Sequence, residues 1–541
     1  MLTPVGTGVL RYSYPMGDTP AVCLTQDIPP SFRVRARARA TKGEDTKEEK
    51  REGEEKEGEK KEGEEKEGGE KEGEKREGEE KEKNQEDDDG ETDQEDPINI
   101  LLLGCGDLRK ILFTINHDAR NILLLTLLID MDSQKPLPPS LHDLFPIYYH
   151  LYLPPRLASF IASQARKLVD VSDSLQAWHE STYGGGLRFC DSYSLSRVRE
   201  IWQCWAKFDG NEPTITDLKA KFEADLAATR DVKPDERVDS TGHGLVYTAV
   251  RSAAPAADED MRHLNILHQW FWRVGRISLT NAAMKESTQV NPMFVTPDAG
   301  RLRMHWGLDP LLGFPLAEAY TRTVDEPEGW GEAGVSSSQK VVALVMMKFA
   351  AWCQSFKDAW AEGSVVTRWF VGDAIAFGHT LQSLASGATR SPHWYRSRHS
   401  FRPLKLDGED YQPDSSTPAP LAFMVIDTSN LIDDLGALNV LVATSPLLEN
   451  NLAATIYTDM LTRYHRTYKE EADNLLCGPF STVALLLGLF CVEHSTNTSP
   501  YPSQDAMTYQ MMKNGSAKAR DMPPKLYQPY ERLRWKRPIA H

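Results

Sequence analysis

INILLLGCGDLRKILFTINHDARNILLLTLLIDMD, residues 98–132, begins with the pattern of a nucleotide-binding strand, turn and helix. The run at 98–103, apolar except for Asn99, is typical of a strand buried in a parallel sheet. Gly104 and Gly106 follow at once, and glycine allows both the positive φ of a sharp turn and the close approach of a ligand. The next helix would present its unpaired N–H groups there. We therefore expect an α/β fold.

The glycine turn is the first candidate cofactor site. Its residues are Gly104, Cys105, Gly106 and Asp107. A dinucleotide motif needs a third glycine where this chain has Arg109, and the GxGxG form needs one where it has Leu108. Asp107 also puts a negative charge where a pyrophosphate would lie, which favours an adenosyl ligand such as S-adenosylmethionine. The alternative is a tight strand-to-helix turn that holds no ligand.

The run ARNILLLTLLID, residues 119–130, has two interpretations. As a second strand it would end in Asp130 (or be followed by Asp132), an acid placed to bind ribose hydroxyls. As a buried helix it has the better length, few β-branched residues and a helix-forming start. Periodicity does not separate the two in so apolar a run.

LAFMVIDTSNL, residues 421–431, predicts a second buried strand that ends in polar residues. Asp427, Ser429 and Asn430 would lie at its carboxyl end, the edge at which open α/β sheets bind ligands. We predict that they line the cofactor site opposite the glycine turn. The alternative is a hydrogen-bonded cap for the following helix. The sequence holds no P-loop, no GxSxG and no HExxH pattern, so it identifies no catalytic residue.

Charge is concentrated in one segment. The whole chain has a formal net charge of −17, and residues 41–96 account for −15 of it. This Glu/Lys/Gly repeat has no apolar face, and each glycine costs a helix ~1 kcal/mol, so we predict that residues 32–96 are a disordered insertion. The rest is near neutral, without the clustered basic face of a nucleic-acid-binding protein, so no nucleic-acid partner is expected.

The remaining sequence predicts a mainly helical insertion between the two strands, at about 141–420, whose tryptophans form core rather than a stacking platform. Within it, residues 391–420 suggest a long loop. Residues 481–493 could be a late strand or a helix, residues 496–541 suggest a loosely structured tail, and residues 1–31 suggest an arm packed on the core.

The seven cysteines contain no CxxC pair and are odd in number, which argues against a structural zinc site and fits a reducing compartment. No apolar run reaches the ~20 residues of a membrane-spanning helix, and no signal peptide is evident. We expect no metal, no membrane partner and a cytoplasmic or nuclear location.

Several blocks, in order, carry a resemblance to a known family. They are YPMGDTPAVCLTQDIPP, INILLLGCGDLRKILFT, ARNILLLTLLID, SDSLQAWHESTYGGGLRFC, DPLLGFPLAEAY, FVGDAIAFGHTLQ and FMVIDTSNLIDDLGALNVLVATSPLL. Over residues 13–31 and 97–495 the chain resembles fungal proteins with domain of unknown function 4470, which often precedes a MYND zinc finger and is related to the N-terminal domain of dynein axonemal assembly factor 3. The resemblance implies a methyltransferase-like Rossmann core with a large helical insertion.

The chain departs from that family in three places. The acidic repeat interrupts a normally short junction, no MYND cysteine cluster follows, and FTINHD runs directly into ARN where the family has a second strand with an acidic tip. By this resemblance residues 119–130 are a helix and Asp130 is not the ribose acid. A true deletion would leave the sheet one strand short, whereas a gene-model error would leave the natural protein intact. We expect a non-catalytic interaction or assembly factor with a protein partner; the alternative is an S-adenosylmethionine-dependent methyltransferase.

Overall fold

The computed structural model describes part of the chain, and the rest lies outside the described residues. The main described ranges are 97–104, 119–131, 140–208, 337–387, 394–397, 400–461, 468–496 and 530–538, with shorter pieces between 220 and 316. The chain divides into two units, one of which is Thr25–Ile98. The predicted disordered insertion lies outside the described residues, and of the predicted N-terminal arm only Leu24 and Ile28 are described, both buried.

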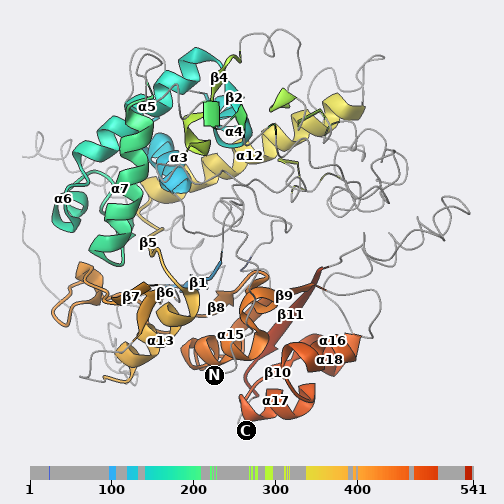
Figure 1. The fold of residues 1–541 in the computed structure, drawn as a ribbon. Helices are drawn as coiled ribbons and strands as arrows, with labels where there is room; N and C mark the ends of the chain where they lie inside the picture. Colours follow the sequence, from blue (N-terminus) through green and yellow to red (C-terminus); the bar gives the residue numbers. More distant parts are fainter. Residues whose placement is uncertain are drawn as a thin grey trace, which may run out of the picture. The chain divides into compact units, whose positions relative to one another are not determined.

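Five strands of the larger unit form one mixed sheet (Figure 1). They are β1 (Ile100–Leu102), β8 (Val425–Asp427), β9 (Thr455–Leu461), β11 (Tyr530–Lys536) and β10 (Phe490–Cys491), in the spatial order β1-β8-β9-β11-β10. The first three are parallel, and β11 is antiparallel to β9 and to β10. The predicted α/β class and the two predicted buried strands are therefore confirmed.

The connection from β8 to β9 is a short helical crossover. It contains α14 (Leu431–Leu435), α15 (Ala437–Thr444) and the 3₁₀ turn η6 (Ser445–Leu447). All three residues of β8 are buried, as expected for a parallel strand covered on both faces. Helix α13 (Ala374–Ala385) packs on α15, where Gly378 faces the carbonyl of Ala443 and a Cβ at that glycine would lie 2.8 Å from the oxygen.

A second core is built from helices. Its main helices are α3 (Ala119–Asp130), α4 (Leu141–Tyr149), α5 (Pro155–Asp170), α7 (Ser192–Ala206) and α12 (Ser337–Ala361). Helix α3 contacts each of the other four, and every one of its residues except Ile129 is buried. Residues 119–130 are therefore a buried helix, and the strand interpretation was wrong. The predicted core tryptophans Trp178, Trp202, Trp205 and Trp369 are almost fully buried, whereas Trp270 is 38 % exposed.

Small paired strands and short helices complete the described fold. The pairs are β2 (Tyr152–Leu153) with β4 (Gln289–Val290), β3 (Leu187–Phe189) with β5 (Thr367–Trp369), and β6 (Tyr395–Ser397) with β7 (Ser400–Pro403). The short helices are α6 (Leu175–His179), η3 (Pro292–Phe294), η5 (Glu409–Tyr411), α16 (Tyr468–Leu475), α17 (Phe480–Leu486) and α18 (Val492–Thr496). The predicted long loop at 391–420 thus contains the β6–β7 hairpin, and residues 481–493 contain both helix and strand.

The predicted loose tail needs a correction. Its described residues include β11, an interior strand of the sheet. The sequence YERLRWK looks polar, but Arg532 is buried against two carboxylates and Arg534 donates to Glu493. Those partners are 41 to 105 residues away in sequence, so the local pattern did not reveal them. Across the described part of the chain, no helix combines the length and the apolarity needed to cross a bilayer.

Candidate functional site

The predicted cofactor turn begins with Gly104, two residues after β1 ends. Its φ of 72° lies in the left-handed region that favours glycine. A Cβ at this position would also lie 2.6 Å from the side chain of Leu431, the first residue of α14. The ends of β1 and β8 therefore meet, as the sequence predicted, and an apolar side chain packs against the glycine. Three predicted site residues lie outside the described residues: Cys105, Gly106 and Asp107.

Asp427, the predicted acid at the end of β8, is part of a buried charged triad. It is 2 % exposed, and its Oδ2 accepts a hydrogen bond from Arg532 Nη2 at 2.5 Å. Arg532 Nη1 donates to both carboxylate oxygens of Asp459 at 3.1 and 3.2 Å. The guanidinium also lies 4.5 Å from the ring centroid of Tyr457. Buried charges persist when they are paired in this way.

Strand register explains why the triad forms. Asp427 pairs with Tyr457 across β8 and β9, and Asp459 pairs with Arg532 across β9 and β11. Because alternate residues of a strand share a face, these four side chains lie on one face of the sheet. Asp427, which was predicted to bind a ligand, thus pairs with Arg532, a cation from the last strand.

Ser429 and Asn430 complete the predicted set. Ser429 is 7 % exposed and has a φ of 49°; its N–H donates to Asp427 Oδ1 at 2.8 Å and its carbonyl accepts from the N–H of Asp459 at 2.8 Å. Asn430 precedes α14, but its side chain makes no cap hydrogen bond. The structure therefore brings Gly104, Asp427, Ser429 and Asn430 to one end of the sheet, with the Asp427 carboxylate and the Ser429 backbone hydrogen-bonded inside the protein. Ligand binding by these residues stays a prediction.

Asp130 lies in the helical core, not at the sheet. Its Oδ2 accepts from Gln164 Nε2 and from Lys167 Nζ, each at 2.8 Å, and from the hydroxyl of Tyr183. Burial, reinforced by this hydrogen bond, raises the pKa of Tyr183 well above its ordinary value. Asp130 therefore joins α3 to α5 and to Tyr183, while Asp132 lies outside the described residues.

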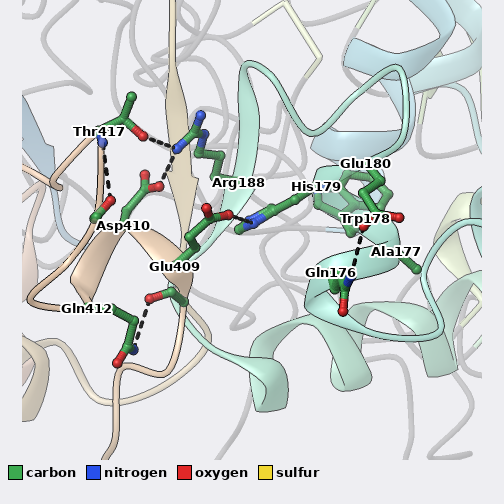
Figure 2. A network of polar contacts seen from close by, with 12 residues as sticks. Gln176, Ala177, Trp178, His179, Glu180, Arg188, Glu409, Asp410, Gln412 and Thr417 are labelled. Carbon is green, nitrogen blue, oxygen red and sulfur yellow. Dashed lines mark hydrogen bonds and ion pairs between the residues drawn. The ribbon is translucent and has the colours of Figure 1, made fainter.

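A second polar cluster was not predicted from the sequence. It is formed by residues 404–419, here called the acidic strap, which lie against β3, β5 and the start of α7. Asp410 is central: its Oδ1 accepts from Arg188, as Figure 2 shows. Its Oδ2 accepts from Arg368 Nε at 2.5 Å. The two arginines are paired neighbours on β5 and β3. The Asp410 side chain is only 4 % exposed, so the strap is anchored by a buried carboxylate.

Two more acids hold the strap beside Asp410. Asp407 accepts from the Ser192 N–H at 2.7 Å and from its hydroxyl at 2.6 Å, and Glu409 contacts His179 Nδ1 at 2.9 Å. Gly408 lies so close to β3 that a Cβ there would be 2.6 Å from the Phe189 carbonyl oxygen. The run DGED was visible in the sequence, but its basic partners precede it by 42 residues (Arg368) and by more than 200 (Arg188 and His179), which is why its role was missed.

The cysteines near these clusters are structural in character. Burial raises the pKa of the Cys190 thiol to about 12, and its Sγ lies 3.4 Å from the hydroxyl of Tyr411. A thiol with so high a pKa is a poor nucleophile. Within the described ranges no cysteine is disulfide-bonded, and no group of His, Cys, Asp or Glu side chains is arranged to hold a metal.

Comparison with known proteins gives no assignment: no protein-family model, no curated protein and no solved structure matches this chain. The resemblance to proteins with domain of unknown function 4470 therefore stays a prediction from the sequence blocks that carry it.

Proposed function

We propose that this chain is a methyltransferase-like α/β protein that acts as a non-catalytic interaction or assembly factor. The observation that carries the proposal is the buried pairing of Asp427 with Arg532 at the end of β8. A methyltransferase would need polar groups at this edge to face its cofactor. Here the predicted acid instead fixes the last strand to the centre of the sheet.

The sheet order supports the methyltransferase-like part. Strands β1, β8 and β9 are parallel neighbours, and their spatial order is that of the first, fourth and fifth strands of a doubly wound sheet. The last strand, β11, runs antiparallel between β9 and β10. This antiparallel insertion distinguishes the sheet from the 3-2-1-4-5-6 order of a dinucleotide-binding fold.

The packing at the glycine turn supports the non-catalytic part. Leu431 lies directly against Gly104, so an apolar side chain takes the space beside the glycine that a cofactor would approach. The two strand ends are also joined directly, since the N–H of Leu103 donates to the Asp427 carbonyl at 2.8 Å. At Gly104, the described residue of the glycine turn, the two sides of the predicted site are thus packed on each other.

The alternative, an S-adenosylmethionine-dependent methyltransferase, keeps one observation in its favour. Gly104 has the positive φ of a ligand-binding turn and lies at the same end of the sheet as Asn430. In this alternative Gly104, Gly106 and Asp107 would hold the cofactor, with Asp427, Ser429 and Asn430 lining the opposite side.

Thermal unfolding of the full chain with and without S-adenosylmethionine separates the two functions. A binder at 100 times its Kd gains ~2.7 kcal/mol of stability. The non-catalytic function predicts an unchanged melting temperature at millimolar ligand, and a dose-dependent increase would favour the enzyme.

A further inference from the structure

The acidic strap ends in a threonine–proline pair with an unusual neighbour. Thr417 and Pro418 are exposed and lie outside any helix or strand. The hydroxyl oxygen of Thr417 accepts a hydrogen bond from Arg188 Nη1 at 2.8 Å (Figure 2). A residue before proline is biased towards extended backbone, the shape in which a modifying enzyme takes up a peptide segment. Thr417 thus combines an accessible hydroxyl with a cation beside it.

The surrounding charges favour an added anion. Arg188 and Arg368 are neighbours on paired strands, and the carboxylate they share is that of Asp410. Both guanidinium side chains retain some exposure, 19 % and 20 %, so they are reachable from solvent. Arg188 Nε, moreover, is buried and has no hydrogen-bond acceptor among the described residues. These two arginines carry one positive charge more than the carboxylate that they share.

We propose that Thr417 is a phosphorylation site for a proline-directed protein kinase. The γ-phosphoryl group of ATP would pass to Thr417 Oγ1: the bond from Oγ1 to phosphorus forms, the bond from phosphorus to the ADP oxygen breaks, and the hydroxyl proton is released. The product adds about two negative charges and three strong acceptor oxygens beside Arg188. Arginine pairs with phosphate through two parallel N–H donors, so the existing contact becomes a charge-assisted one.

The structural consequence is a tighter strap. Asp410 keeps its bond to Arg368, and the phosphate takes up donors of Arg188. Residues 404–419 are then held to β3 by an additional anion at their C-terminal end. Phosphorylation of Thr417 would therefore increase the stability of the strap and would not unfold it.

The chain supplies an internal comparison. Within the described residues the Ser/Thr–Pro dipeptide occurs once more, at Ser445–Pro446 in η6. Ser445 is 9 % exposed and its carbonyl accepts from Arg537 at 2.8 Å, so it is not presented to a kinase. The sequence alone does not distinguish the two dipeptides as phosphorylation sites, but their accessibility does.

The test uses the full chain, a proline-directed kinase, ATP and mass-spectrometric mapping, followed by thermal unfolding. We expect phosphate on Thr417 and none on Ser445, with a melting temperature raised by about 2–4 °C. Thr417→Ala should lose the shift, Pro418→Ala should be a poor substrate, and Arg188→Lys, which keeps the charge but loses the planar fork, should show a smaller shift.

Two results would overturn the proposal. One is a Thr417 that stays unmodified in the folded chain while a synthetic peptide of residues 411–423, the control for kinase activity, is phosphorylated. The other is a phosphorylated Thr417 with an unchanged or lower melting temperature. Because Thr417→Ala removes only an exposed hydroxyl and methyl group, with one exposed hydrogen bond from Arg188, it serves as the folded reference even if Arg188→Lys is unstable.

Discussion

Arg532 is the central residue of the buried charged triad in the sheet. It is 3 % exposed and contacts Asp427 and Asp459, two carboxylates on neighbouring strands. Removing the guanidinium would leave both acids buried without their shared cation. We predict that Arg532→Met lowers the free energy of unfolding by about 3–5 kcal/mol in urea titrations.

The matched control is Arg156→Met. Its ion pair with Asp143 at 2.9 Å is exposed, with the arginine side chain 57 % accessible, and exposed pairs contribute about 0–1 kcal/mol. Equal, small losses in the two variants would contradict the buried triad.

Gly104 tests the packing of the glycine turn. Gly104→Ala would incur both the cost of a left-handed backbone, about 1–2 kcal/mol, and a clash with Leu431. Gly363→Ala is the control, because Gly363 has a φ of 66° but open space around its Cβ position. We predict that the Gly104 variant loses more unfolding free energy than the control. Its excess should shrink when Leu431→Ala is added, and an excess that survives would contradict the contact.

At the scale of elements, helix α13 tests how much a side-chain cap at the N-terminus of a helix contributes to stability. Asp373 precedes it and accepts hydrogen bonds from the N–H groups of Ile375 and Ala376, each at 3.0 Å. Asp373→Ala should lower stability by about 1 kcal/mol, whereas Asp373→Asn should cost little, because asparagine caps about as well. Chemical denaturation measures both. If Asp373→Asn loses as much stability as Asp373→Ala, the source of the stability is the charge of Asp373 and not its capping hydrogen bonds.

Elements differed in how well the sequence predicted them. The apolar strands β1 and β8 were recognisable because both faces of a parallel strand are buried. Helix α3 was ambiguous, since a helix buried on all sides shows no periodicity. Strand β11 was missed because its arginines look solvated until Asp427 and Asp459 are placed beside them. At the candidate site, position at the sheet edge was predictable, but the internal pairing of Asp427 was not.

At the scale of the whole molecule, acid stability is set in part by His150. Burial, with the nearby positive charge of Arg276 as a second cause, lowers its pKa from 6.5 to about 3. Below about pH 6.5 the unfolded chain therefore binds a proton at His150 that the folded chain does not bind. Stability from the neutral imidazole is fully present above pH 6.5 and is lost as the pH falls towards 3, by up to about 1.4 kcal/mol per pH unit.

His150→Gln checks this pH dependence. Glutamine keeps an acceptor for the Ile277 N–H, which donates to His150 Nε2 at 3.3 Å, but it does not titrate. Unfolding free energies measured from pH 7 to pH 4 should fall less steeply in the variant. Parallel curves for the variant and the parent chain would exclude His150 as the cause.

The proposed function requires a methyltransferase-like sheet whose predicted ligand edge is closed by its own side chains. Isothermal titration of S-adenosylmethionine into the full chain tests it most directly. We expect no saturable heat up to ~1 mM ligand, a concentration that corresponds to a binding free energy of about −4.1 kcal/mol. Saturable one-site binding that is lost in Gly104→Ala would contradict it and would identify the turn after β1 as a working cofactor site.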